Sequence, residues 1–591
     1  MLLSPALMAR RIRKAQGLDI ADLCVTNARI VDVFSGEILE NTDLLIGDGI
    51  FLAFVDKGTG RAAKTLDAQG RYLLPGLIDA HVHIESSHLC PEQFAAQALP
   101  HGVTTVVADP HEIANVLGMD GIRYMLDSSA HTPLDVRFML PSCVPATPFE
   151  HAGAELPAGF LAEYMGNPRV LGLGEMMNTP GVCGADAQVL DKLLLTHAYG
   201  KVVDGHAPAL QGAPLDAYCG CGIHTDHECS TPEEMRDRLR RGMYVLLRQG
   251  SAACNLAALL PAVTPENSRR CCFCTDDASP ADILEHGYIE RHVRMAVAAG
   301  IPPMTAIRMA TLNTAECYNM TDKGAVAPGY AADFLLTDDL HTFAVRAVYA
   351  KGKAVAADGD MLLPSAPPLR PASVCNTMRT MPLQTDSFAV PVPSGKAHVI
   401  SVIPHEIITK NVVMNVRTHD GLFDPTDNAG LLKIAVVERH KGTGTVGTGI
   451  LHGYCKEGVP MRGAIATTVS HDSHNIIVAG DNDADMRCAV ATLSGTGGGI
   501  CLIRDGRVLN MLPLPIAGLM SFQSAAEMAK STQELRRTAM REFSLQEGVE
   551  PVMTLSFMAL VVIPSLRITD QGLFDVDSFS FCAVDAGSES A

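Results

Sequence analysis

The middle of the chain, roughly residues 72–320, alternates short apolar runs with helical stretches. The apolar runs are almost continuously hydrophobic, which is typical of strands that are buried on both faces. They include residues 103–108, 136–140, 170–174 and 202–206. Alternation of strands and helices over this length predicts a parallel α/β barrel, with a doubly wound open sheet as the competing fold.

Two strand-rich segments flank this middle section. Residues 22–58 contain short apolar runs separated by Gly and Asp, and residues 327–358 show a similar pattern. We expect the two flanks to build one small β domain, with limits at 1–71 and 321–362, around a barrel at 72–320.

The last part of the chain predicts a further domain. A Pro-rich stretch at 363–374 reads as a linker, and residues 375–591 are rich in strands and glycines. Residues 442–447 match the glycine pattern of dinucleotide-binding loops and follow an apolar strand. The residues after them do not read as a helix, so no helix N-terminus is available for a pyrophosphate. A glycine-rich hairpin is the favoured interpretation.

Composition narrows the class of protein. The chain has 591 residues, 47% of them hydrophobic, which is enough for two to four domains with a large core. A formal charge of −19 argues against binding to nucleic acid or to an anionic membrane. We see no signal peptide and no apolar run of the roughly 20 residues that span a membrane. With 17 cysteines, the best interpretation is a cytoplasmic protein with free thiols.

The run at residues 76–83 is a short apolar strand that ends in two histidines. Side chains alternate between the two faces of a strand, so His81 and His83 are expected to point to the same side. Two neighbouring imidazoles at a strand end are well placed to hold a metal ion.

Other residues of metal-binding type follow the predicted strands. In a parallel barrel, catalytic groups gather where the C-terminal ends of the strands meet. The residues at these positions are His81, His83, Glu175, His206, His227 and Asp276. Each has a structural alternative: a single histidine is most often structural, Asp276 could cap a helix, and Glu175 could be an ordinary carboxylate. Six such residues at successive strand ends favour a metal centre.

The segment at residues 75–83 resembles the first-strand motif of the amidohydrolase superfamily. Three further segments narrow the resemblance to the adenine deaminases of the bacterial type, and a fourth, 469–475, resembles the extra C-terminal domain of that family. Those three segments are 83–88, 109–116 and 225–229. The resemblance covers nearly the whole chain. It implies a distorted (β/α)8 barrel with a small β domain, and hydrolysis of adenine to hypoxanthine and ammonia by a metal-bound hydroxide that attacks purine C6.

The sequence carries information on the number of metal ions. Many two-metal relatives bridge their ions with a carboxylated lysine after strand four, but this chain has no lysine between Lys64 and Lys192. Glu175 supplies an equivalent bridging carboxylate. The single-metal purine deaminases carry a glutamate three residues after the strand-five histidine, where this chain has Ala209 after His206. Both departures favour two ions.

We therefore expect His81, His83 and Asp276 on one ion and His206 and His227 on the other. Their ligand types suit Mn²⁺, Fe²⁺ or Zn²⁺, and the resemblance implies manganese or iron.

The remaining roles follow from the chemistry of deamination. Asp276 can accept the proton of the attacking water and pass it toward the leaving amine. An acid should also protonate a ring nitrogen: Glu85 is the first candidate, on the same face as His83 if the strand continues, and Glu228 is the second. Both could instead orient a histidine. Candidates for substrate contact are Ser86, Asp109, His111 and Glu112. A C-terminal loop with His471, Asp472 and His474 could close over the barrel.

Two other functions remain open at this point. One is a cyclic-amide hydrolase of the same superfamily, and the other is a barrel that has lost its metals and serves as a scaffold. The six retained ligand types speak against the scaffold. Cys271 and Cys274 superficially resemble the zinc cysteines of cytidine-type deaminases, but Arg270 stands where those carry proline. We expect adenine as the substrate and a homo-oligomer.

Overall fold

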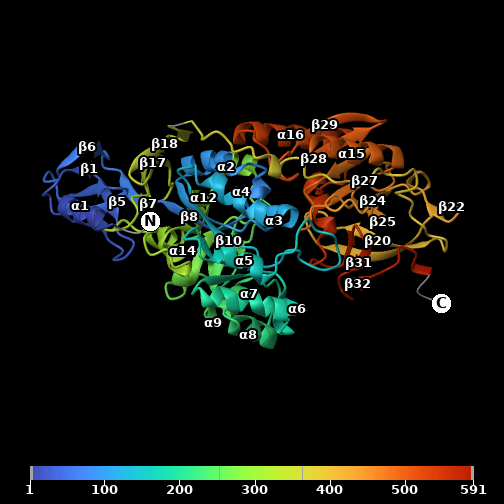
Figure 1. Ribbon diagram of the computed structural model, residues 1–591, viewed down its shortest axis with the longest axis horizontal. Coiled ribbons are helices and arrows are strands. Elements are labelled where there is room, and N and C mark those ends of the chain that lie inside the picture. Colours follow the sequence, from blue (N-terminus) through green and yellow to red (C-terminus); the bar gives the residue numbers. More distant parts are fainter. Residues whose placement is uncertain (1–3, 252, 363, 588–591) are drawn as a thin grey trace.

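A computed structural model of the chain describes residues 4–251, 253–362 and 364–587. Three bodies follow one another along its long axis (Figure 1). A small β domain lies at one end, a barrel lies in the middle, and a C-terminal domain lies at the other end.

Eight parallel strands form the barrel. They are β8 (Leu77–Val82), β9 (Val103–Ala108), β10 (Asp135–Leu140), β11 (Val170–Met176), β12 (Val202–Gly205), β13 (Thr225–Asp226), β14 (Tyr244–Arg248) and β15 (Cys271–Cys274). The first five form one sheet and the last three another. Parallel bridges between Val203 and Ile223 and between Val82 and Asp276 join the sheets. The predicted barrel is therefore confirmed, and the open sheet is wrong.

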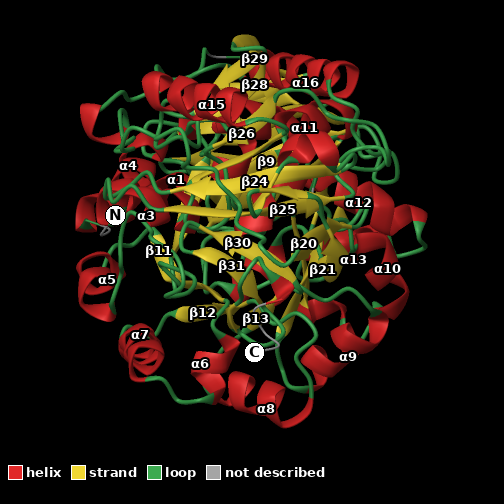
Figure 2. Cartoon of the chain, turned by 90° about the vertical axis from the view of Figure 1, so that its right-hand side faces the viewer, coloured by secondary structure: helices red, strands yellow, loops and turns green. Residues whose placement is uncertain are grey.

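Helices connect the barrel strands and surround them (Figure 2). They are α2 (Pro91–Ala98), α3 (His111–Leu117), α4 (Met119–Ser129), α5 (Ala158–Met165), α6 (Thr179–Cys183), α7 (Ala187–Ala198), α8 (Gly212–Gly220), α9 (Pro232–Arg240), α10 (Leu256–Leu259), α11 (Pro280–His286), α12 (Ile289–Ala298), α13 (Pro303–Met309) and α14 (Leu312–Cys317). Among the described residues, no helix has both the length and the hydrophobicity needed to cross a membrane.

A buried polar contact holds the seam where the first and last barrel strands meet. The carboxylate of Asp79 on β8 accepts hydrogen bonds from the backbone N–H of Thr275, at 3.1 Å, and from the hydroxyl of Tyr288, at 2.6 Å. Burial raises the pKa of Asp79 to about 6, although these hydrogen bonds oppose the shift. The seam therefore brings the end of β8 next to the segment that follows β15.

The small β domain has two sheets, and strands from both flanks of the barrel share the larger one. One sheet has the order β5 (Ile50–Asp56), β4 (Thr42–Gly47), β1 (Ala21–Thr26), β6 (Ala62–Asp67). The other has the order β19 (Asp360–Met361), β18 (Lys353–Ala357), β17 (Val345–Ala350), β16 (Phe334–Thr337), β7 (Tyr72–Pro75), β2 (Arg29–Val31), β3 (Ile38–Leu39). Helix α1 (Pro5–Ala15) packs on the first sheet. Strand β7 leads directly into β8, which places this domain at the N-terminal end of that strand.

An eight-stranded sheet is the centre of the C-terminal domain. Its order is β21 (Thr409–Asn415), β20 (Lys396–Val402), β25 (Val446–His452), β24 (Leu431–Val437), β27 (Ile476–Gly480), β26 (Ala464–Thr467), β28 (Gly499–Arg504), β29 (Arg507–Pro513). Helices α15 (Asp483–Thr496), α16 (Ala525–Glu542) and α17 (Pro551–Ser556) pack on it. Small sheets of β22 (Thr418–His419) with β23 (Leu422–Phe423), and of β30 (Leu566–Thr569), β31 (Gly572–Asp575) and β32 (Ser580–Phe581), complete it. Strands β24 and β25 are antiparallel neighbours, so residues 442–445 lie in the hairpin loop between them and Val446 and Gly447 begin β25.

The C-terminal domain is seated on the barrel face where the strands end. The N–H of Cys90 donates to the Ser521 carbonyl at 3.1 Å, and His88 Nδ1 donates to the Leu519 carbonyl at the same distance. Buried apolar residues of the barrel and of this domain belong to one continuous core. The face that carries the predicted site is therefore covered by the C-terminal domain.

Candidate metal centre

His81 and His83 lie where the first barrel strand meets the last. The backbone N–H of Asp276 donates to the His81 carbonyl at 2.9 Å, and the N–H of His83 donates to the Asp276 carbonyl at 3.0 Å. This pairing holds both imidazoles at the seam, with their Nε2 atoms 3.2 Å apart. His81 and His83 are both buried. The two histidines thus share one side, as the alternation along the strand predicts.

The chain does not continue as a strand after His83. Strand β8 ends at Val82, and the 3₁₀ helix η1 (Ile84–Ser87) follows. The expectation that Glu85 shares a strand face with His83 is therefore wrong, because residues of a 3₁₀ turn do not alternate between two faces.

Glu175, near the end of β11, faces both groups of histidines with different oxygens. Its Oε1 lies 3.3 Å from His83 Nε2, while Oε2 lies 2.8 Å from His206 Nδ1 and 3.2 Å from His227 Nε2. Burial opposes ionisation, but contacts with His206, His227 and His83 outweigh it and hold the pKa of the carboxyl well below its usual range. A carboxylate divided in this way has the geometry of a bridging ligand.

Asp276 completes the first group from the end of β15. Its Oδ1 lies 3.0 Å from His83 Nε2 and 3.6 Å from His81 Nε2. Its Oδ2 accepts a hydrogen bond from Arg248 at 2.6 Å. Burial opposes ionisation of Asp276, but Arg248 and the two histidines hold the pKa of the carboxyl well below its usual range.

The donor set fits divalent cations. His83 Nδ1 donates to the Asp109 carbonyl at 2.9 Å, so the lone pair of the neutral ring is on Nε2, which faces Glu175, Asp276 and the Nε2 of His81. Buried lone pairs that face one another in this way repel unless a cation lies between them. The structure brings all six predicted ligands together in overlapping groups that could hold a metal ion.

One charged residue of the site, Arg248, was missed by sequence reasoning. Arg248, the last residue of β14, contacts the carboxylates of both Glu228 and Asp276. Glu228 Oε1 also lies 3.4 Å from His227 Nε2. Arg248 could have been predicted as a site residue from its position at a strand end, but only residue types that bind metals were considered at those positions. Glu228, the second candidate for the proton donor, is ion-paired to Arg248. Burial opposes ionisation of its carboxyl group, but His206 and Arg248 outweigh burial and lower its pKa.

Asp109 positions two of the predicted ligands. Its carbonyl accepts from His83, and its Oδ2 accepts the backbone N–H of Glu175 at 3.0 Å. Gly174 makes this approach possible, because a Cβ at that position would lie 2.0 Å from Asp109 Oδ2. The contacts assign Asp109 to the support of the ligands.

The other candidates for substrate contact line the same strand ends. His111 packs edge-on against His83, with ring centres 4.6 Å apart, and its Nδ1 lies 3.4 Å from Glu175 Oε1. Ser86 donates to Asp277. The Oε1 of Glu85 accepts the N–H of Ile113 at 3.2 Å, and its Oε2 is buried with no hydrogen-bond partner in the described part of the chain.

Glu112 does not point into an open mouth, because two histidines of the C-terminal domain bind it. His471 Nδ1 lies 2.7 Å from Glu112 Oε1, and His474 Nε2 contacts Oε2. All three side chains are largely buried. The loop at 470–475 therefore reaches the barrel.

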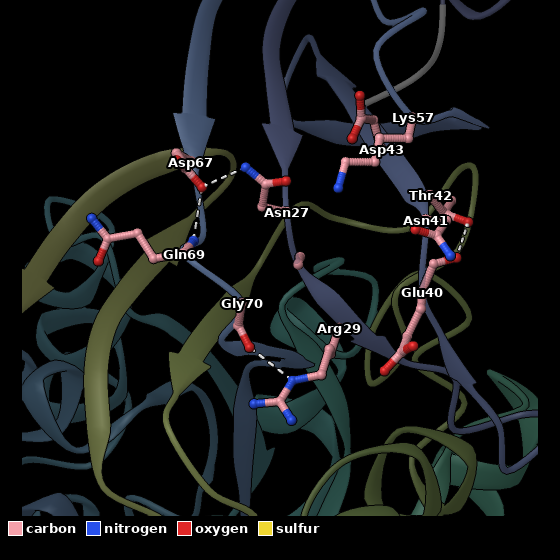
Figure 3. A pocket seen from close by; sticks show the side chains of 11 residues that line it. Asn27, Arg29, Glu40, Asn41, Thr42, Asp43, Lys57, Asp67, Gln69 and Gly70 are labelled. Atoms are coloured by element: carbon pink, nitrogen blue, oxygen red, sulfur yellow. Dashed lines mark hydrogen bonds between the residues drawn. The ribbon is translucent and has the colours of Figure 1, made fainter.

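A polar cavity of about 490 Å³ lies elsewhere, in the small β domain. Figure 3 shows Asn27 bonded to Asp67 and Arg29 bonded to the Gly70 carbonyl. These groups are engaged with one another, and the cavity lies at the opposite end of β8 from the metal-binding groups. Cys271 and Cys274 are buried residues of β15.

Comparisons with known proteins identify the family to which this architecture belongs. The Amidohydrolase family model matches residues 72–355, and the model of the Adenine deaminase C-terminal domain matches residues 406–580. An adenine deaminase of Nitratidesulfovibrio vulgaris (strain DP4) is 56% identical over 96% of this chain and 97% of its own length. The chain belongs to the adenine deaminase family.

Relatives in other bacteria extend the likeness. Adenine deaminases of Halalkalibacterium halodurans and Geobacillus kaustophilus are each 46% identical, over 97% and 96% of this chain and 97% of their own lengths. The resemblance predicted from short motifs is confirmed along nearly the whole chain. The amidohydrolase family uses divalent metal ions, and the histidine and carboxylate clusters of this barrel suit such ions.

Proposed function

We propose that this chain hydrolyses adenine to hypoxanthine and ammonia. The observation that carries the proposal is the division of the Glu175 carboxylate between His83 on one side and His206 and His227 on the other. This two-centre donor set lies in a barrel whose full-length relatives are named adenine deaminases. The reaction forms a bond from a water oxygen to C6 and breaks the bond from C6 to the amino nitrogen, which leaves as ammonia.

The ligand assignment follows the two oxygens of Glu175, of which Oε1 faces His83 and Oε2 faces His206 and His227. His81, His83 and Asp276 would hold one ion, His206 and His227 the other, and Glu175 would bridge them. Two ions of manganese or iron, with zinc as a further possibility, suit these ligands. Such ions, when bound, acidify and orient a water molecule. The chain itself supplies ligands on strand ends, which are buried apart from the part-exposed His206 and so are held in place by packing.

Asp276 and Glu85 are the residues that move protons in this proposal. Asp276 Oδ1 faces the ligand cluster, while Arg248 holds Oδ2, so the carboxylate has one fixed orientation from which to accept a proton of the water. Glu85 is 3% exposed, and burial raises its pKa to about 7. A carboxyl group with that pKa is able to donate a proton to a purine ring nitrogen at neutral pH.

The remaining assignments complete the proposal. Ser86 and His111 contact the substrate, whereas Asp109 and Glu112 support the site around it. The enzyme acts in the cytoplasm as a homo-oligomer, in purine salvage. The 17 cysteines, free of disulfides in the described part of the chain, suit a reducing compartment.

The direct test is an assay with adenine and the manganese-loaded protein. Deamination changes the ultraviolet spectrum of the purine and releases one ammonia per adenine consumed. Absence of both signals would overturn the proposal, and hydrolysis of a hydantoin or a dihydropyrimidine instead would favour the cyclic-amide hydrolase.

A second test concerns Glu85. The variant E85Q should reduce turnover by about 10²-fold or more, since it removes a general acid without changing the shape of the side chain. The variant E316Q, at an exposed glutamate, is the matched control. Wild-type turnover in E85Q would exclude the role.

A further inference from the structure

The loop at residues 470–475 is fixed on the barrel from two directions. His471 and His474 both contact Glu112, the second residue of α3, which lies on the side of the barrel next to the C-terminal domain (Figure 1). The Asn475 side chain donates to the His151 carbonyl, in the loop after β10, at 2.8 Å. The loop is thus held between two connections of the barrel face that carries the metal-binding groups.

The cluster of Glu112, His471 and His474 is a clamp rather than another metal site. The backbone N–H of Ser470 donates to His474 Nδ1 at 3.1 Å, so this nitrogen carries the lone pair. The proton of the neutral ring is then on Nε2, which donates to Glu112. A metal ion would need a lone pair on that same nitrogen. The clamp therefore positions the loop.

Asp472 lies between the two clamp histidines in sequence and is buried, with 3% of its surface exposed. Its Oδ2 has no hydrogen-bond partner in the described part of the chain. The charged groups that act on it include His111 and Glu175, both of which belong to the barrel site. The C-terminal domain thus places a buried carboxylate oxygen without a hydrogen-bond donor close enough to His111 and Glu175 to be affected by their charges.

A buried acceptor without a donor is costly, more so when it is charged, and marks a place where a ligand or water binds. The Oε2 of Glu85 is a second such oxygen at this face. Adenine has the matching donors. When C6 lies at the metal-binding groups and N1 lies near Glu85, the imidazole ring is the part of adenine farthest from these groups. The N–H of that ring then needs an acceptor on the opposite wall of the site.

We propose that Asp472 accepts the hydrogen bond from the imidazole-ring N–H of adenine, and that it thereby selects the free base over N9-substituted purines. This inference rests on the proposed function. An N9 substituent removes the hydrogen, leaves the buried carboxylate unpaired and meets a wall that the clamp holds in place. Asp472 is thus a specificity residue supplied by the C-terminal domain to a site on the barrel.

The test compares adenine with 9-methyladenine in D472L and D472N. Leucine keeps the approximate shape and removes the acceptor, while asparagine keeps an acceptor oxygen without the charge. We expect D472L to lower kcat/KM for adenine by about 10- to 100-fold, mainly through KM, with D472N in between. The value for 9-methyladenine should hardly change, so the preference ratio falls. D386N, at an exposed aspartate of the same domain, should keep the wild-type ratio.

Binding provides a readout that does not depend on turnover. Calorimetry should give wild type a stronger affinity for hypoxanthine than for 9-methylhypoxanthine, and D472L should lose most of that difference. Metal content and thermal unfolding show whether each variant is folded, and D472N carries the test if D472L is not. An unchanged preference in folded variants of an active enzyme overturns this inference alone. Failure of the wild type to deaminate adenine overturns the proposed function instead.

Discussion

Glu112 of the barrel and His471 of the C-terminal domain are joined by a contact of 2.7 Å between Oε1 and Nδ1. His474 contacts the other oxygen of the same carboxylate from a position 362 residues along the chain. One buried carboxylate thus links the two bodies at the face where the metal-binding groups lie.

The clamp predicts a pH dependence of stability. Burial opposes protonation of His471, but Glu112 outweighs it and raises the pKa of the imidazole to about 9, above the ordinary 6.5. A raised folded-state pKa means that the contribution of His471 is fully present below about pH 6.5 and is lost as the pH rises through 9. We expect the difference in free energy of unfolding between wild type and H471N to shrink from pH 6.5 to 9.5.

Urea titrations at several pH values measure that difference. H341N, at a histidine with 72% of its side chain exposed, should show no such trend and serves as the control. A difference between wild type and H471N that stays constant over the window would contradict the charged clamp.

Glu175 predicts the metal content of the protein. Because its two oxygens face different histidine groups, E175Q should weaken the hold on both ions, and we expect fewer than two ions per chain and turnover lowered by at least about 10²-fold. Metal analysis after full reconstitution checks this, with E316Q as the control. Two retained ions in E175Q would argue that the histidines and Asp276 suffice.

Gly174 predicts an effect that acts through Asp109. In G174A the new Cβ would lie 2.0 Å from Asp109 Oδ2, so the carboxylate must move and release the Glu175 backbone N–H. We expect metal affinity to fall by about 10- to 100-fold, the usual effect of losing a residue that orients a ligand. Competition with a chelator measures the affinity. G159A, where a Cβ meets nothing within 4 Å, should bind metal like wild type.

Much of the fold, and the meeting of the predicted ligands at one face, could be predicted from local sequence patterns. The apolar run at 103–108 coincides with β9, because a strand buried on both faces needs hydrophobic residues throughout. The ligand types at the ends of β8, β11 and β12 converge because parallel strands of one barrel end at one face.

Other features depend on distant contacts. Alternation along β8 cannot tell that the chain turns into η1 after His83, which moved Glu85 off the expected face. The sequence suggested that the loop with His471 and His474 could close over the barrel, but the choice of Glu112 as their partner depends on how one domain is seated on the other, which neither local sequence encodes. Arg248 was missed for a different reason, since it stands at a strand end but is not a metal ligand.

Arg248 leads to the last prediction. It is buried and contacts the carboxylates of Glu228 and Asp276, so R248M would leave these two buried carboxylates with histidine contacts but without their guanidinium partner in the metal-free protein. We expect the free energy of unfolding to fall by about 3–5 kcal/mol, as when one partner of a buried ion pair is removed. R248K should recover part of the loss, since lysine restores the charge but not the forked geometry. Adding E228Q to R248M should recover more, and urea titrations of wild type, R248M, E228Q and the double variant give the coupling. Strictly additive effects of R248M and E228Q would show that the two side chains act independently.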